Sequence, residues 1–282
     1  SDRYGFNNPD SEWDKKTDII LVGDSFAHGY CVKENLDIGS LIRDNSKYSL
    51  LNLGWMGNGP LLEYASLIEY GFERKPKKII WVFFESDLLN LKANINIKLL
   101  KKYLAENFKQ DLINRDSEKN QKLKKIILEE TSRAVKINKK KYIKNIIKLY
   151  NFRTIISKLL PEKFRLSNNK YQEPPSEEVD SETLSLFEDI IKKVKVLSDK
   201  KNIELYFVYI PRYTSVKSKK FNSWNRNEVI SIIKNNKIDL INMYDVLVKE
   251  KNFSSFYPFG LDGHFNNKGY KLLSNHILKT IN

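Results

Sequence analysis

The residues best suited to chemistry in this chain are a serine near its start and a histidine near its end. Ser25 lies in the stretch ILVGDSFAHG (residues 20–29), where an apolar run ends in a small, sharply turning cluster. A serine hydroxyl becomes a nucleophile when an imidazole removes its proton and a carboxylate orients that imidazole. Serine and aspartate are also preferred at helix N-caps, so this stretch alone favours a cap.

Three histidines are available as a base, and their surroundings separate them. His28 lies three residues after Ser25 and is as well placed to cover the turn as to act. His276 lies in the pattern KLLSNHIL, which is typical of a packed helix. His264 lies in the glycine-rich stretch FGLDGHFNNKGY, with Asp262 two residues before it. We take His264 as the candidate base and Asp262 as its orienting carboxylate, with a plain turn and helix cap as the alternative.

The hydrophobic pattern predicts how these residues are positioned. Apolar, β-rich runs typical of buried parallel strands cover residues 18–23, 48–53, 78–84, 203–210 and 238–241. Helical patterns cover residues 59–71, 180–201, 226–236 and 266–281. This alternation predicts an α/β fold with a mainly parallel five-stranded sheet and helices on both faces. Ligands bind beyond the carboxyl ends of such strands, so we expect Ser25 and His264 at one edge.

The loops after the second and third expected strands carry groups that could stabilise an oxyanion. The first, NLGWMGNGP (residues 52–60), has three glycines, whose freedom lets backbone N–H groups approach a ligand. The second, FFESDLLN (residues 83–90), places polar side chains at the same edge. Ordinary loop chemistry, with solvated or capping side chains, is the alternative for both.

We call the four stretches described above blocks one to four, in chain order: the stretch around Ser25, the two loops after the second and third expected strands, and the stretch around His264. Together these four blocks resemble the SGNH/GDSL hydrolase superfamily, over residues 16–87 and 203–281. The resemblance implies a flavodoxin-like three-layer α/β/α fold and a Ser–His–Asp site for O-ester chemistry. It implies Ser25 as nucleophile and first oxyanion donor, Gly57 as second donor, His264 as base and Asp262 as its orienting carboxylate.

The third block departs from the family pattern. Glu85-Ser86-Asp87 stands where the family has Gly-Asn-Asp, so Ser86 takes the place of the asparagine donor. Loss of one oxyanion donor costs about 10²–10³ in rate. Asn58 is a candidate substitute. Arg212, in YIPRY after the fourth expected strand, is a candidate substrate contact, with a plain surface charge as its alternative.

The resemblance implies a serine esterase that removes O-acyl groups, with O-acetyl expected, from a carbohydrate or another small ester through an acyl-enzyme on Ser25. Two alternatives stay open. One is a polysaccharide O-acetyltransferase with the same triad, and the other is a non-enzymatic glycan-binding module with a decayed oxyanion hole. The stretches DRYGFNNPDSEW and YIPRY resemble a bacterial branch linked to cell-surface polysaccharide modification.

The net charge of +14 is concentrated in one segment. Residues 92–165 hold 21 Lys and Arg against 7 Asp and Glu, whereas the remainder is balanced. We expect a single catalytic domain over residues 1–282 that contains a basic helical insertion at residues 92–178, with a polar linker at 168–176. A solvated helical cap is the first interpretation of the insertion, and binding to an anionic polymer or membrane surface is the alternative. No nucleic-acid motif is present.

The sequence predicts no cofactor and no metal. One cysteine, Cys31, and three dispersed histidines offer no ligand cluster, and no glycine-rich phosphate loop follows the first expected strand. No apolar run reaches the ~20 residues that span a bilayer. The chain starts at Ser1 and joins the fold at once, which favours a processed or truncated N-terminus. We expect a place in the bacterial cell envelope or periplasm, with the cytoplasm as the alternative.

Overall fold

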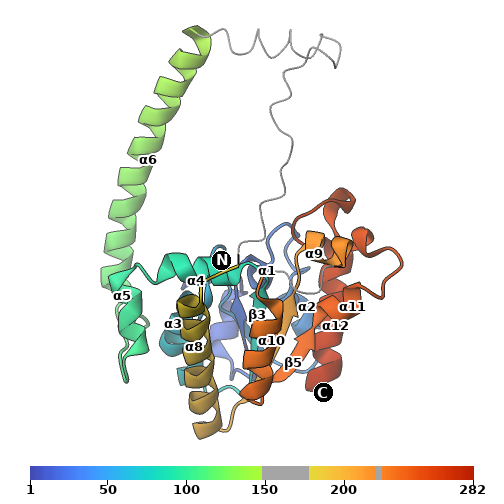
Figure 1. The fold of residues 1–282 in the computed structure, drawn as a ribbon. Helices are drawn as coiled ribbons and strands as arrows, with labels where there is room; N and C mark the ends of the chain where they lie inside the picture. Colours follow the sequence, from blue (N-terminus) through green and yellow to red (C-terminus); the bar gives the residue numbers. More distant parts are fainter. Residues whose placement is uncertain (148–177, 220–223) are drawn as a thin grey trace, which may run out of the picture. The chain divides into compact units, whose positions relative to one another are not determined.

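The computed structural model describes residues 1–147, 178–219 and 224–282, and the chain divides into two compact units (Figure 1). The first unit comprises residues 1–110 and 176–282, and the second comprises residues 111–175. Residues 92–110 belong to the first unit, so the second unit is shorter than the expected insertion. The expected linker at 168–176 lies wholly outside the described residues.

Five parallel strands form one sheet in the order β2-β1-β3-β4-β5. Their bounds are β1 (Ile19–Gly23), β2 (Leu50–Asn52), β3 (Lys78–Phe84), β4 (Glu204–Ile210) and β5 (Asp239–Asn242). Each strand that the sequence predicts is present. The order reverses at β1, which has β2 on one side and β3 on the other. Ligands bind at such a switch point, beyond the carboxyl ends of the strands.

Helices cover both faces of this sheet, and α8 and α12 lie on opposite sides of the strands in Figure 1. One face carries α1 (Ser25–His28), α2 (Ile38–Asp44), α11 (Met243–Leu247) and α12 (Asn267–Ile281). The other carries α3 (Pro60–Ser66), α4 (Asp87–Asn94), α8 (Ser181–Lys200) and α10 (Arg226–Asn235). This three-layer α/β/α arrangement confirms the predicted fold class.

Shorter helices connect these layers. They are η1 (Asp10–Asp14), the π-helical η2 (Leu67–Gly71), η3 (Phe72–Arg74), α5 (Lys98–Lys101), η4 (Lys102–Leu104), α9 (Tyr213–Ser218), η6 (Phe253–Phe256) and η7 (Pro258–Gly260). The helix predicted at residues 59–71 thus changes from α to π geometry after Ser66.

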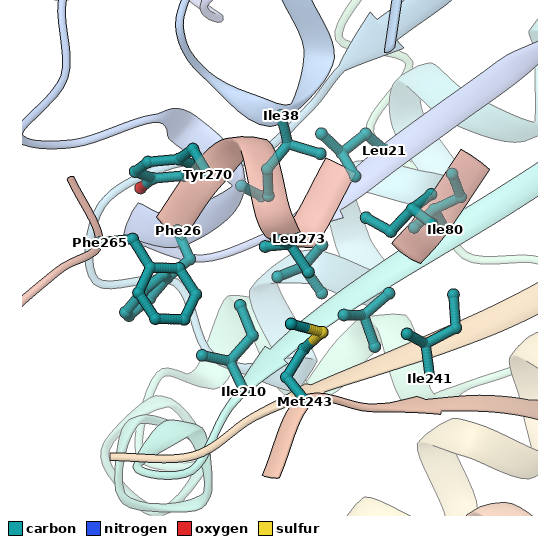
Figure 2. Packing of buried hydrophobic residues seen from close by; sticks show 14 of the residues in the cluster. Leu21, Phe26, Ile38, Ile80, Ile210, Ile241, Met243, Phe265, Tyr270 and Leu273 are labelled. Carbon is teal, nitrogen blue, oxygen red and sulfur yellow. The ribbon is translucent and has the colours of Figure 1, made fainter. Parts of the chain in front are cut away.

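The core beneath α2 and α12 reaches the edge of the sheet that carries Ser25. Strand residues such as Leu21, Ile80 and Ile210 belong to the same buried cluster as Leu273 of α12 (Figure 2). Next to them, the buried rings of Phe26 and Phe265 lie with their centroids 5.3 Å apart. Tyr270 of α12 packs beside both. The core therefore holds the residues that directly follow Ser25 and His264.

The second unit contains α6 (Asp116–Ile147). Four large apolar side chains on this helix are exposed: Leu123, Ile126, Ile127 and Leu128. Ion pairs such as Lys122–Glu118 and Arg133–Glu130 lie along the same helix. Across the described residues, α6 included, no helix has an apolar stretch that could cross a bilayer.

Candidate active site

The turn after β1 places Ser25 at the start of α1. Gly23 ends the strand at φ +154°, and a Cβ there would lie 2.4 Å from the Val82 carbonyl oxygen, so the close approach requires glycine. Asp24 is the N-cap of α1, and its carboxylate accepts a hydrogen bond from the Phe26 N–H at 2.8 Å. The cap is therefore Asp24, and the Ser25 hydroxyl is not used for that purpose.

The Ser25 hydroxyl instead meets His264. Ser25 Oγ lies 2.7 Å from His264 Nε2, across 239 residues of sequence. The imidazole ring packs against Phe26 at 4.8 Å and against Tyr30 at 5.2 Å between ring centroids. Ser25 Oγ also lies 3.1 Å from a carboxylate oxygen of Asp24. A hydroxyl and an imidazole at this distance have the geometry of a nucleophile and its general base.

Burial of the His264 ring lowers the pKa of its imidazole below the ordinary value of 6.5. The cause is desolvation, which disfavours the charged imidazolium. The neutral imidazole is the form that accepts a proton from serine. Its surroundings therefore extend the pH range over which His264 can act as a base.

Asp262 is not in hydrogen-bond contact with His264. Its residue is exposed, and within the described part of the chain no hydrogen bond joins its carboxylate to the imidazole. Burial is the largest cause that raises the pKa of the Tyr257 hydroxyl, and the negative charge of Asp262 is the next. The Asp262 carboxylate therefore lies close enough to Tyr257 to act on it electrostatically. The structure brings together two of the three predicted triad residues, and the role of Asp262 stays a prediction.

The predicted oxyanion donors follow three neighbouring strands. Ser25 opens α1 after β1, so its N–H is one of the helix N–H groups that have no intrahelical acceptor. Gly57 lies in the exposed loop after β2 at φ +74°, with open space where a Cβ would be. Ser86 follows β3 as the half-buried N-cap of α4, and its hydroxyl makes no capping hydrogen bond. All three lie at the carboxyl edge of the sheet.

The two predicted substrate contacts lie at the same edge. Asn58 is buried, and its carbonyl accepts a hydrogen bond from Asn90 Nδ2 at 3.2 Å. Its side-chain amide makes no hydrogen bond to the described residues. Arg212 follows β4, and its N–H donates to Glu85 Oε2 at 2.8 Å. The Arg212 guanidinium lies over the ring of Trp224, 4.7 Å from its centroid.

A buried ion pair supports this edge, and sequence reasoning missed it. Glu85 and Arg226 are both fully buried, with Glu85 Oε1 2.8 Å from an Arg226 nitrogen. Glu85 also accepts hydrogen bonds from the hydroxyls of Tyr209 and Ser215. The guanidinium lies 3.7 Å from the ring centroid of Tyr244. Glu85 stands where the family has a glycine, and this difference was a signal that the position has an unusual role. No local sequence pattern points to its partner Arg226, which lies 141 residues away.

Three buried carboxyl groups, one of them on Asp24 beside Ser25, lie within electrostatic range of one another. Burial raises the pKa of Asp24 to about 6. Burial, followed by the charge of Asp24, holds the pKa values of Glu63 and Asp87 well above their ordinary range. Trp81 Nε1 donates to Glu63 and the Phe84 N–H donates to Asp87, but no ion pair with a described residue neutralises these groups. Among described residues, no cluster of His, Cys, Asp and Glu side chains could hold a metal ion.

The other two histidines make local contacts. His28 Nδ1 lies 3.4 Å from the Gly54 carbonyl oxygen, and its ring meets the ring of Trp55 edge to face at 5.1 Å. His276 Nδ1 lies 2.9 Å from the Leu272 carbonyl oxygen within α12. Neither contacts Ser25, so His264 is the histidine that the tertiary structure pairs with the serine.

Comparison with known proteins identifies the fold. No protein-family model matches this chain, and no curated protein sequence does. Among solved structures, one described as lipolytic and of the G-D-S-L family, from Desulfitobacterium hafniense DCB-2, matches with a TM-score of 0.50 and 12% identity, over 93% of this chain and 98% of its own. The acetyl xylan esterase AlAXEase matches with a TM-score of 0.50 and 14% identity, over 94% of this chain and 100% of its own. TesA matches with a TM-score of 0.50 and 8% identity, over 94% of this chain and 98% of its own. At these identities the likeness is one of fold.

Proposed function

Because this chain has the fold of the SGNH/GDSL hydrolases, we propose that it is a serine esterase with Ser25 as nucleophile and His264 as base. The observation that carries the proposal is the 2.7 Å approach of Ser25 Oγ to His264 Nε2. Ser25 Oγ bonds to the ester carbonyl carbon while its proton passes to Nε2. The tetrahedral intermediate then expels the alcohol, which takes that proton, and leaves the acyl group on Ser25. Water, deprotonated by His264, releases the acid.

The developing negative charge needs donors that are already in place. We assign the first two to the backbone N–H groups of Ser25 and Gly57. The third is the hydroxyl of Ser86 or the side-chain amide of Asn58. Neither side chain makes a hydrogen bond to the described residues, so each keeps a donor for the oxyanion.

Packing supports the orientation of His264 in this proposal. Its ring contacts the rings of Phe26 and Tyr30, with centroid distances of 4.8 and 5.2 Å. The Nδ1 atom has no acceptor among the described residues. Catalysis in this arrangement therefore depends first on the Ser25–His264 pair, and Asp262 remains the residue that the sequence nominates to orient the ring.

A carbohydrate bearing O-acetyl groups is the substrate that we propose. Tyr30 is 47% exposed and Trp55 is 44% exposed, although both are aromatic. Trp55 lies beside the nucleophile turn, because its N–H donates to the Gly23 carbonyl oxygen at 3.2 Å. Exposed apolar groups gathered at one place mark binding surfaces. An aromatic face suits the C–H face of a sugar ring and leaves the hydroxyls in water, and an acetyl xylan esterase shares this fold.

The test is turnover of p-nitrophenyl acetate by the chain beside Ser25→Ala and His264→Ala. Ser117→Ala, in α6, and His276→Gln are the matched controls. We expect losses of about 10³-fold or more in both site variants and none in the controls. A serine-directed phosphonate should label Ser25, which mass spectrometry detects.

Other outcomes would redirect the proposal. An acetyl group that persists on Ser25 in water but moves to an oligosaccharide hydroxyl would identify a transferase. Absence of both turnover and labelling in the folded protein would contradict the esterase and favour a binding module.

A further inference from the structure

Arg212 is held between the two loops that flank the Ser25–His264 pair. Its N–H donates to Glu85 Oε2 at 2.8 Å, and Glu85 directly precedes Ser86. The next residue, Tyr213, donates from its hydroxyl to the Gly260 carbonyl oxygen at 2.8 Å, in the loop that leads to His264. Its ring also meets the ring of Tyr257 at 4.9 Å. The backbone of Arg212 is therefore fixed at the catalytic edge of the sheet.

The side chain of Arg212 is also held in place. Its guanidinium lies 4.7 Å from the ring centroid of Trp224, and that ring is only 7% exposed. Stacking on an aromatic face fixes the plane of a guanidinium and leaves its N–H edge available to a planar anion. Glu85, the nearby carboxylate, is already occupied by Arg226, Tyr209, Ser215 and the Arg212 backbone N–H.

Arg212 differs from every other arginine in the described part of the chain in the partners of its guanidinium. Its guanidinium makes no hydrogen bond and no ion pair there. Each of the others donates to a carboxylate, a carbonyl or a side-chain oxygen, and these are Arg3, Arg43, Arg74, Arg115, Arg133 and Arg226. A positioned, half-buried guanidinium that has no hydrogen-bond or ion-pair partner among the described residues is suited to bind an anion from outside.

We propose that Arg212 binds an anionic oxygen group of the substrate, so that the substrate is an acyl ester of an acidic carbohydrate. This inference rests on the proposed function. The fork of N–H donors matches a carboxylate or a phosphate with two parallel hydrogen bonds. A uronic acid or a sugar phosphate would each supply that group. The ester would then lie at Ser25 while the negative charge lies at Arg212.

The experiment compares substrates that differ only in charge. An acetylated oligogalacturonide and its methyl-esterified form have the same sugars and acetyl groups, but only the first carries carboxylates. We expect the wild-type chain to prefer the free acid in kcat/KM by about 10- to 100-fold, the range of a charge-assisted hydrogen bond. Arg212→Met should abolish the preference mainly through KM, and Arg212→Lys should restore part of it. Lys201→Met, near the opposite end of β4, should keep it.

A binding measurement tests this inference independently of the proposed esterase activity. Calorimetry on Ser25→Ala measures affinity for both oligogalacturonides without turnover, and Arg212→Met in that background should lose the selectivity. Competition by glucose 6-phosphate against glucose tests the phosphate as the anion. Selective binding without any p-nitrophenyl acetate turnover would reject the esterase and keep the acidic ligand. The inference would be overturned if the free-acid and methyl-esterified oligogalacturonides bind equally and glucose 6-phosphate competes no better than glucose. It would also be overturned if the selectivity for the charged ligand survives Arg212→Met.

Discussion

Phe26 and Phe265 pack against each other with ring centroids 5.3 Å apart, and each directly follows one member of the Ser25–His264 pair. The two halves of the candidate site lie 239 residues apart in sequence. Because both rings are buried in one core cluster, the packing that stabilises the fold also sets the distance between hydroxyl and imidazole. We therefore expect stability and the proposed catalysis to be coupled at this contact.

This coupling predicts an effect of Phe265→Leu on catalysis beyond its effect on stability. The smaller side chain loosens the contact with Phe26, so the chain should remain folded at 25 °C while kcat for p-nitrophenyl acetate falls about tenfold, equivalent to about 1.4 kcal/mol in the barrier. The control is Phe187→Leu, which changes a buried ring on the other face of the sheet. Equal losses of kcat in the two variants would contradict the coupling.

The buried Glu85–Arg226 pair predicts a large cost when one partner is removed. Glu85→Gln or Arg226→Met leaves its partner's charge buried and uncompensated, so each should lower the free energy of unfolding by about 3–5 kcal/mol. The double variant should lose less than the sum of the two single changes. Urea unfolding of all four proteins measures both effects, and strict additivity would show that the pair is not coupled.

The buried carboxyl groups predict that stability falls as pH rises. Folded Asp24 has a pKa of about 6 against an ordinary 3.8, so between these values the folded state binds more protons than the unfolded state. Its share of the unfolding free energy should drop by about 2 kcal/mol from pH 4 to pH 6. The raised pKa values of Glu63 and Asp87 extend the decline to higher pH.

Glu63→Gln removes one of these groups, so it should make the decline shallower than in the wild-type chain. Urea unfolding across pH 5–8 measures the slope. Glu178→Gln, which changes an exposed carboxylate, is the control and should leave the slope unchanged. An unfolding free energy that rises with pH over this range would contradict the assignment.

The desolvated imidazole predicts the acid limb of the pH–rate profile. Burial lowers the pKa of His264, so kcat/KM should rise with pH through a midpoint below 6.5. Tyr30→Ala uncovers the ring that Tyr30 contacts at 5.2 Å and should move the midpoint upward. A downward shift, or no shift, in that variant would show that burial does not set the pKa.

The position of Asp262 predicts that it contributes little to orienting His264. Its carboxylate makes no hydrogen bond to the imidazole, so Asp262→Asn should keep at least about a tenth of the wild-type kcat/KM. In a serine protease with a contacting triad, the same change costs about 10⁴-fold. A loss of that size here would mean that the carboxylate reaches the ring during turnover.

Local pattern was enough to predict the architecture. Apolar runs and helical periodicity placed each strand and the long helices of the first unit to within a few residues, since the side chains that must be buried recur with the geometry of each element. Strand–helix alternation implied a parallel sheet, and a parallel sheet brings the turn after residue 23 and the loop before His264 to one edge. The candidate nucleophile and base followed from that topology.

Tertiary structure alone decided which of these residues meet. It identified Asp24 rather than Ser25 as the helix cap, because capping depends on backbone angles and on which N–H faces the carboxylate. It joined Ser25 to His264 but not Asp262 to His264. It paired Glu85 with Arg226, and it left the Arg212 guanidinium without a hydrogen bond or ion pair to any described residue. Such contacts join residues far apart in sequence, or depend on side-chain directions within a loop. Packing of the whole core fixes these long-range contacts and side-chain directions, and no local periodicity in the sequence encodes them.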